Sequence, residues 1–286
     1  MIRLLIAIIF ISLFGCSTKS IFQESYGCCD DNLFYNVIDN NIGDKPDLHT
    51  MVYFNNYTDT VFPSENILKF NNLSCLCVYG LDNRLHDNLK LSHIPQKLII
   101  DTNKLNTLNK IKVLELGWFD LSVFPNELLC LKNLKSLLLD CCLQDSIPKG
   151  ICNLPNIEVL TFRLNNISDV PPWLTEIKKL RVIDLGNNTL KHIPLVLAKC
   201  DSLQIINLAN QEGYFVNGIE NYDLPVNRIS YLNEISQLEN LLTKENIVRV
   251  IIEVHNANAK KEIKKYLKEK GLDKKIRIMV RRMFYS

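Results

Sequence analysis

Apolar side chains recur through the middle of the chain with a period of 23 residues. Each period contains the spacing L-x-x-L-x-L, in which alternate side chains of a short strand point to one face. One such strand per period predicts a stack of parallel strands that share one continuous core. The apolar triplets are Ile111, Leu114 and Leu116; Leu134, Leu137 and Leu139; Ile157, Leu160 and Phe162; Leu180, Ile183 and Leu185; Leu203, Ile206 and Leu208.

Each strand is followed by a position suited to a polar side chain. Asn165 and Asn188 occupy it in two periods and Cys142 in a third, whereas Phe119 and Gln211 depart from the pattern. An asparagine here can hydrogen-bond turn groups that no strand ladder satisfies. An apolar-Pro pair then begins a helical or 3₁₀ turn on the opposite side of the strand. The four pairs are Phe124-Pro125, Ile147-Pro148, Val170-Pro171 and Ile193-Pro194.

The combined pattern resembles the leucine-rich repeat family in its 23-residue form with the proline. The resemblance implies an α/β solenoid, with a curved parallel sheet on the concave side and short helices or 3₁₀ turns on the convex side. It also implies a binding function. We expect repeats over residues 48–211, regular between 111 and 208. Looser units precede the regular ones: Leu48, Met51 and Tyr53 with Phe62-Pro63, then Leu73, Leu76 and Val78.

Two insertions interrupt the period. Ile94-Pro95 arrives eight residues late, and a loop over 211–221 delays Leu224-Pro225. Such loops lie on one face of a solenoid and either vary recognition or drift neutrally.

Residues 212–286 no longer follow the repeat. The pattern predicts an amphipathic helix from Ile229 to Leu242, a strand over 247–254, a helix over 257–270 and a strand from Ile276. The simplest arrangement extends the solenoid sheet into a C-terminal α/β cap; a separate small α/β domain is the alternative.

The first fifteen residues are typical of a signal peptide. Leu4 to Phe14 is apolar except for Ser12, and eleven residues are too few to cross a bilayer. Leu13-Phe14-Gly15-Cys16 resembles the lipobox of bacterial lipoproteins. The resemblance implies a lipid-modified Cys16, palmitate among its acyl chains, and a membrane-anchored protein at the periplasmic face or cell surface of the bacterial envelope. Residues 16–47 would form a tether and N-terminal cap. A plain secretory signal with a chance cysteine is the alternative.

Residues between and just after the leucines line the concave face. Trp118, Leu138 and Leu164 are large and apolar, and we expect them to be exposed on adjacent repeats. An aromatic anchor with charges nearby is the composition of a protein-binding hot spot. The alternative is that Trp118 folds back over the neighbouring loop. The charged residues that we include in this predicted site are Glu115, Asp140, Arg163 and Asp184.

Net charge is only +2, which gives no reason to expect a nucleic-acid partner. The sum hides a basic C-terminal segment: residues 260–282 hold eleven Lys/Arg against three Asp/Glu. Five of these lysines fall on one side of the predicted helix, which is usually a solvated face but could contact anionic lipid headgroups. They are Lys260, Lys261, Lys264, Lys265 and Lys268.

No motif for catalysis or for a cofactor occurs in the sequence. Apart from Cys16, the nine remaining cysteines show no metal-ligand spacing and are best explained as small apolar core residues. We therefore expect no enzyme activity, no cofactor and no metal. The two functions that the sequence supports are a lipid-anchored module that binds protein or peptide, and a structural or adhesion component of the envelope. The oligomeric state is left open.

Overall fold

The computed structural model describes residues 34–38 (backbone), 51–55, 57–80, 95–209, 211, 234–254 and 256–280. The chain divides into two compact units, Met1–Phe34 and Tyr35–Ser286, and the second contains every repeat. The predicted signal peptide and Cys16 lie outside the described residues, as does most of the predicted tether. None of the described helices has the length and apolar character needed to cross a membrane.

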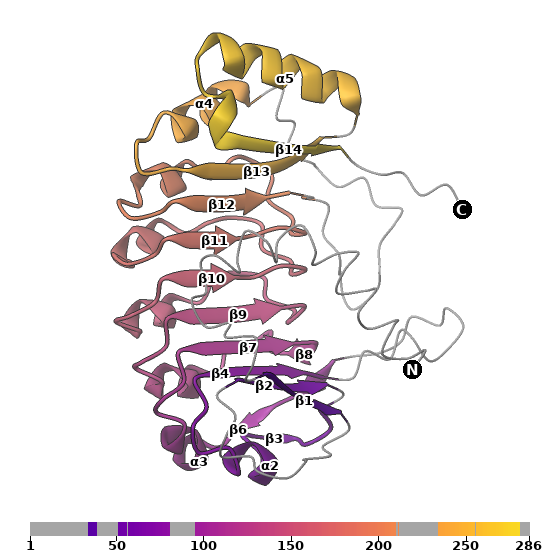
Figure 1. The fold of residues 1–286 in the computed structure, drawn as a ribbon, viewed down its shortest axis with the longest axis vertical. Coiled ribbons are helices and arrows are strands. Elements are labelled where there is room, and N and C mark those ends of the chain that lie inside the picture. The colour runs from indigo at the N-terminus through magenta and orange to yellow at the C-terminus, as the bar shows by residue number, and fades with distance from the viewer. Residues whose placement is uncertain are drawn as a thin grey trace, which may run out of the picture. The chain divides into compact units, whose positions relative to one another are not determined.

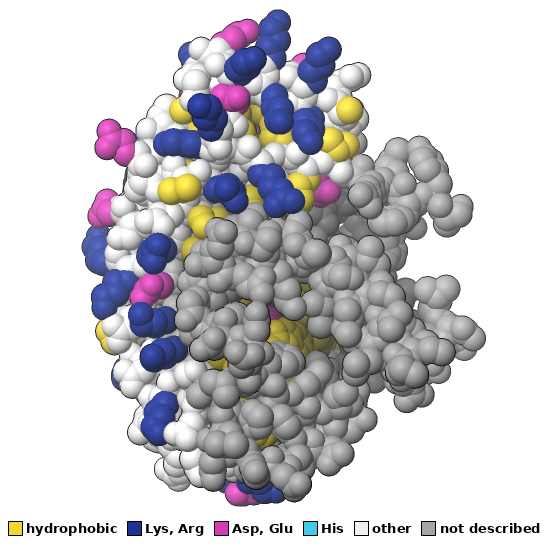
Figure 2. Space-filling model, in the orientation of Figure 1, with side chains coloured by type: hydrophobic (Ala, Val, Ile, Leu, Met, Phe, Trp, Pro, Cys, Tyr) yellow, Lys and Arg dark blue, Asp and Glu magenta, His cyan; other side chains and the backbone are white. Residues whose placement is uncertain are grey.

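One long sheet runs through the second unit, with one strand for each repeat (Figure 1). Its order is β1-β2-β4-β7-β9-β10-β11-β12-β13-β14, and adjacent strands from β2 onward are parallel. The strands are β1 (Phe34–Ile38), β2 (Met51–Asn55), β4 (Cys75–Tyr79), β7 (Val113–Gly117), β9 (Ser136–Asp140), β10 (Val159–Thr161), β11 (Val182–Asp184), β12 (Ile205–Leu208), β13 (Arg249–Val254) and β14 (Ile276–Val280). Lys and Arg side chains follow the edge where the strands begin (Figure 2).

The predicted core is confirmed in the regular repeats. The apolar triplets are all at most 1% exposed, so each strand buries its leucines between the sheet and the convex side. Burial of this kind stabilises by roughly 25 cal/mol per Å² of apolar surface removed from water. On the convex side each proline precedes a 3₁₀ turn: η4 (Asn126–Cys130), η5 (Lys149–Asn153), η6 (Pro172–Glu176) and η7 (Leu195–Lys199).

The predicted phase of the first looser unit is wrong by one residue. Val52 and Phe54 are fully buried, whereas Met51 and Tyr53 point to the other face and are only half-buried. The register pairs Val52 with Leu76 and Phe54 with Val78, which are core residues of the next repeat. A shift of one residue moves every side chain of a strand to the opposite face.

The hydrogen bonds made at the asparagine position of each repeat are more regular than the residue types found there. Asn165 Nδ2 donates to the carbonyls of residues 139 and 163, 2.7 and 3.0 Å away, and its Oδ1 accepts from the amides of residues 142 and 144 at 3.0 and 2.9 Å. Asn188 repeats the pattern one repeat later. Gln211, which the sequence marks as a departure, also donates to the carbonyls 26 and 2 positions before it, at 2.7 and 3.4 Å. Cys142 directs its Sγ to the equivalent two carbonyls at 3.2 and 3.3 Å.

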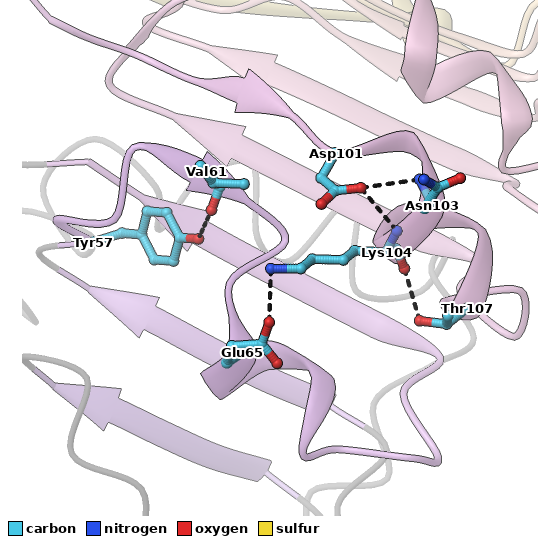
Figure 3. A network of polar contacts seen from close by, with 7 residues as sticks. All are labelled: Tyr57, Val61, Glu65, Asp101, Asn103, Lys104 and Thr107. Atoms are coloured by element: carbon cyan, nitrogen blue, oxygen red, sulfur yellow. Dashed lines mark hydrogen bonds and ion pairs between the residues drawn. The ribbon is translucent and has the colours of Figure 1, made fainter.

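Aromatic rings replace this column toward the N-terminus. Tyr57 and Phe119 hold the asparagine positions of their repeats, are fully buried, and meet edge to face with ring centroids 6.2 Å apart. The Tyr57 hydroxyl donates to the Val61 carbonyl at 2.9 Å (Figure 3). Burial raises the pKa of Tyr57 to about 12.

Short elements support this aromatic end of the core. They are β3 (Val61–Phe62), which pairs with β6 (Ile99–Ile100); β5 (Gln96–Lys97), which pairs with β8 (Phe119–Asp120); and helices α2 (Glu65–Leu68) and α3 (Thr102–Thr107). Asp101 caps α3 by accepting from the amides of Asn103 and Lys104 at 3.0 and 3.1 Å. Lys104 Nζ then lies 2.7 Å from Glu65 Oε1 and links α3 to α2 (Figure 3).

The C-terminal segment extends the same sheet. β13 pairs with β12 and β14 pairs with β13, both in parallel, so the α/β arrangement forms the cap predicted for this fold. Helix α4 (Ile235–Leu242) precedes β13, and α5 (Ala257–Glu269) connects β13 to β14. Helix α5 buries Ile263 and Leu267.

Candidate functional site

The strand residues between the leucines lie on the face opposite the core, which we call the concave face. The register aligns these residues in columns that cross the repeats. The first column is β-branched in four of five regular repeats: Val113, Ser136, Val159, Val182 and Ile205. The second column differs in composition, because polar side chains occupy four of its five positions: Glu115, Leu138, Thr161, Asp184 and Asn207.

Asp140 is the last residue of β9, and its side chain contacts Thr161 of the second column. Its Oδ1 accepts hydrogen bonds from Thr161 Oγ1 at 2.8 Å and from the Arg163 amide at 2.9 Å. Burial raises the pKa of Asp140, and the positive charge of Arg163 acts in the opposite direction. The carboxyl is therefore fixed in position between two repeats.

Asp184 carries the most unusual group of this face. Its Oδ1 accepts from the Gly186 amide and from Asn207 Nδ2, each at 2.9 Å. Its Oδ2 is buried and has no hydrogen-bond partner among the described residues. The side chain is 0% exposed, and burial raises its pKa from 3.8 to about 6. A buried acceptor without a donor costs about 1–3 kcal/mol, so its presence needs an explanation.

Glu115 lies three strands from Asp184 and contacts an aromatic pair. The Tyr79 hydroxyl donates to Glu115 Oε1, and the Tyr79 ring stacks on Tyr53 at 5.9 Å between centroids. Burial, followed by the charge of Asp140, raises the pKa of Glu115. Gly117 provides the space for the ring, because a Cβ at this position would lie 2.7 Å from Tyr79 Cδ1.

Three carboxyl groups and one guanidinium thus gather across β7 to β11. The charges of Asp140 and Asp184 both raise the pKa of Arg163, against the effect of its burial. With all four groups ionised, the cluster of Glu115, Asp140, Arg163 and Asp184 has a net charge of −2. We call these four residues the charged cluster. It suits a ligand group that brings positive charge or hydrogen-bond donors.

The structure brings together all four charged residues that the sequence predicted for this site. The predicted exposure of Leu138 is wrong: its side chain is 7% exposed, and it lies in register between Glu115 and Thr161 on the adjacent strands. Trp118 and Leu164, which were also expected to be exposed, are half-buried.

The half-burial of Trp118 and Leu164 accompanies a repeated backbone conformation. Trp118, Cys141, Leu164 and Asn187 occur at intervals of 23 residues, and all have a positive φ of 56–64°. Their amides donate to the carbonyl of the next repeat, for example from Trp118 to Asp140 at 3.3 Å and from Leu164 to Gly186 at 3.1 Å. This left-handed position turns the chain out of the strand, and it is unusual for residues other than glycine and asparagine.

Sequence reasoning did not select Tyr79, Thr161 or Asn207 as site residues. Each hydrogen-bonds a carboxylate of the charged cluster. The sequence could have indicated Thr161 and Asn207, because the repeat spacing places them in the same column as Glu115 and Asp184. Tyr79 was hidden because its repeat departs from the regular period.

No protein-family model and no curated protein matches the chain. Solved structures match it at low identity. A leucine-rich repeat protein of Leptospira interrogans is 16% identical, with 84% of this chain and 51% of that chain covered and a TM-score of 0.45. An internalin of Listeria monocytogenes is 15% identical, with 82% and 61% covered and a TM-score of 0.44. A chain of the Drosophila Toll–Spatzle complex is 16% identical, with 73% and 24% covered and a TM-score of 0.47. This chain spans about half the length of the Leptospira protein.

Three features recur together every 23 residues: a strand of the parallel sheet, a buried side chain that hydrogen-bonds the turn, and a 3₁₀ turn after proline. The fold is a leucine-rich repeat solenoid. Its concave face carries the charged cluster.

Outside the concave face, the solenoid presents the lysines of α5. Lys261, Lys264, Lys265 and Lys268 are exposed and Lys260 is half-buried, while Ile263 and Leu267 are fully buried.

Neither the cysteines nor the acidic residues form a metal site in the described part of the solenoid. All seven cysteines described there are free, and five of them are buried. The remaining cysteines, at positions 16, 28 and 29, lie outside the described residues.

Proposed function

We propose that this protein is a lipid-anchored leucine-rich repeat protein of the bacterial cell envelope that binds a protein or peptide on its concave face. Solenoids of this kind use the face of the parallel sheet as an extended binding surface. We infer a binding rather than a catalytic role, and no cofactor.

The charged cluster is the observation that carries the proposal. A sheet face that serves only stability favours β-branched residues, as the first column illustrates with Val113, Val159 and Val182. The next column instead buries carboxyl groups with raised pKa values, and one of them has an oxygen with no hydrogen-bond partner in the described part of the chain. Perturbed carboxyl groups of this kind concentrate at functional sites.

The cluster also defines the chemistry of the partner. Carboxyl groups outnumber the guanidinium, so the partner segment would present a Lys or Arg side chain or an N-terminal amine. Trp118 and Leu164 lie at the end of the strands beside the cluster and would pack against the apolar stem of that segment.

Site-specific photo-crosslinking in the native cell tests the proposal. A photoreactive residue at position 118 or 164 should give a discrete adduct with a partner identifiable by mass spectrometry. The matched control is position 123, because Val123, between β8 and η4, is 86% exposed. The Trp118→Ala/Leu164→Ala variant should weaken capture of that partner by at least tenfold. Adducts that are absent at 118 and 164, or equally strong at 123, would contradict a concave binding site.

The lipid anchor has an independent test. Palmitate labelling should require Cys16 and disappear in Cys16→Ser, and processing should be sensitive to globomycin. Normal processing and no labelling of the wild-type chain would indicate a plain secretory signal.

A second membrane contact is proposed for the exposed lysines of α5. The unlipidated protein should associate with vesicles that contain anionic lipid and dissociate as salt is raised. Association that salt does not change, or none at all, would leave these lysines as a solvated helix face.

A further inference from the structure

A hollow lies at the edge of the sheet where the strands begin, away from the charged cluster. Its volume is about 790 Å³, within the roughly 300–1,000 Å³ typical of ligand-binding clefts. Three lysines and several asparagines line it, and its lining contains neither a carboxylate nor an aromatic ring: Lys110, Lys112, Lys135, Asn109, Asn133 and Asn156. We call this hollow the lysine groove. In Figure 2 the edge that contains it carries a series of Lys and Arg side chains.

The solenoid fixes the spacing of these cations. The Lys112 amide donates to the Ser74 carbonyl and the Lys135 amide donates to the Lys112 carbonyl, both at 2.8 Å. Lys112 and Lys135 therefore start adjacent strands, which lie about 4.8 Å apart. The groove holds a short ladder of positive charge along the solenoid axis.

The positive charge of the groove is largely uncompensated. Lys135 pairs with Glu158 at 3.0 Å, which lies just beyond the lining. Lys110 Nζ lies 3.0 Å from the amide oxygen of Asn72, a neutral partner. Among the described residues, neither Lys110 nor Lys112 forms an ion pair. All three lysines are exposed.

The asparagines give the groove fixed neutral polar groups. Asn133 Nδ2 donates to the Asn109 carbonyl at 2.7 Å, and Asn156 Nδ2 donates to the Lys132 carbonyl at 3.0 Å. These bonds hold the side chains and leave the Oδ1 of Asn133 without a donor among the described residues. An ordered amide oxygen is an acceptor for the hydroxyl group of a ligand.

We propose that the lysine groove binds an anionic polysaccharide, a sugar polymer with carboxylate or sulfate groups. The lysines would neutralise its acidic groups and the asparagines would bind its hydroxyls. A single-stranded nucleic acid is disfavoured because the lining offers no aromatic ring on which a base could stack. A bilayer surface is disfavoured because a plane of headgroups does not enter a hollow.

Binding of defined polymers to the full chain tests the proposal. The probes are polygalacturonate and dextran sulfate, with uncharged dextran as the neutral control and poly(U) as the nucleic-acid control. We expect salt-sensitive binding of at least one anionic glycan and none of dextran. The preferred glycan distinguishes a carboxylate from a sulfate ligand.

Two double variants with the same loss of charge separate this groove from general attraction. Lys110→Ala/Lys112→Ala should weaken glycan binding at least tenfold, whereas Lys261→Ala/Lys264→Ala on α5 should change it less than twofold. The four lysines are exposed, and the contacts of Lys110 are made only by its terminal Nζ. All variants should therefore unfold at the same urea concentration as the wild type. Equal losses in both variants, no binding of either anionic glycan, or preferential binding of poly(U) would each overturn the proposal. Loss of glycan binding would leave the concave-face proposal intact, since the two sites share no residue.

Discussion

Replacing Asn165 by alanine is the sharpest test of how this solenoid is held together. Asn165 is 0% exposed and makes four hydrogen bonds to backbone groups of two consecutive repeats. Alanine would leave the amides of residues 142 and 144 without these acceptors in a buried position.

The magnitude follows from those groups. A buried donor that loses its acceptor costs about 1–3 kcal/mol, so two orphaned amides predict a loss of roughly 2–6 kcal/mol, centred near 4. The carbonyl of Arg163 keeps another donor, the Cys141 amide at 2.9 Å, and adds little to the loss. Asn165→Cys should fall between the wild type and Asn165→Ala, because Cys142 already shows that a thiol can reach the two carbonyls but cannot replace the amide oxygen.

Urea unfolding of the full chain, followed by far-UV circular dichroism, measures the loss. The control is Asn153→Ala, which removes an exposed asparagine of η5 and should change stability by less than about 0.5 kcal/mol. Unfolding of a repeat protein can lose cooperativity, so the m-values of all variants must agree before free energies are compared. An Asn165→Ala loss below about 1 kcal/mol, or one equal to that of Asn153→Ala, would refute the argument from buried backbone groups.

Three further predictions concern the two faces of the sheet. Because the pKa of Asp184 is raised from 3.8 to about 6 in the folded state, its contribution to stability is full below pH 3.8 and is lost as pH rises through 6. Asp184→Asn should therefore gain stability relative to the wild type by up to ~3 kcal/mol between pH 4 and 7.5, and a constant difference in urea midpoint would contradict this. Leu164→Asn should change stability by less than about 1 kcal/mol, because relief of the left-handed backbone offsets the lost leucine, as Asn187 illustrates one repeat later. Leu160→Ala, which empties a fully buried position, should cost about 2–5 kcal/mol in the same measurement. Equal losses for Leu160→Ala and Leu164→Asn would contradict the distinction between a core leucine and a leucine in the left-handed position.

The regular repeats could be predicted because five periods carry the same spacing and each one checks the others. The register of the unit at β2 could not be predicted from the sequence. Met51, Val52, Tyr53 and Phe54 are consecutive apolar residues, so the strand has no alternation from which its phase can be taken. Only the pairing of Val52 with Leu76 shows which side chains face the core.

Gln211 illustrates a different limit. As a residue type it departs from the asparagine of the leucine-rich repeat pattern, yet its amide makes the same two carbonyl contacts that Asn188 makes one repeat earlier. A longer side chain reaches the same backbone groups, and sequence matching does not contain that information. In the repeats of β9 to β12 the position is filled by an amide within reach of these carbonyls, or by a thiol as a weaker substitute.

The candidate site divides in the same way. Register alone places Glu115 and Asp184 in one column, so the members of the charged cluster could be found from the sequence. Their burial could not, because it depends on how neighbouring side chains fill the face. Leu138, for example, was expected to be exposed because of its place on the concave face, but its side chain is buried in the structure.

The contrast between two adjacent columns of one sheet gives the best argument that this face has a function. Both columns belong to the same strands and face the same side, so backbone geometry imposes the same demands on each. The first column contains the β-branched residues Val113, Val159 and Val182. The second column contains Asp184, whose Oδ2 has no hydrogen-bond partner among the described residues. A residue that lowers stability at neutral pH is retained where activity requires it. If Asp184→Asn both stabilises the solenoid and abolishes capture of the concave-face partner, the cost in stability and the gain in binding will have been traced to the same carboxyl group.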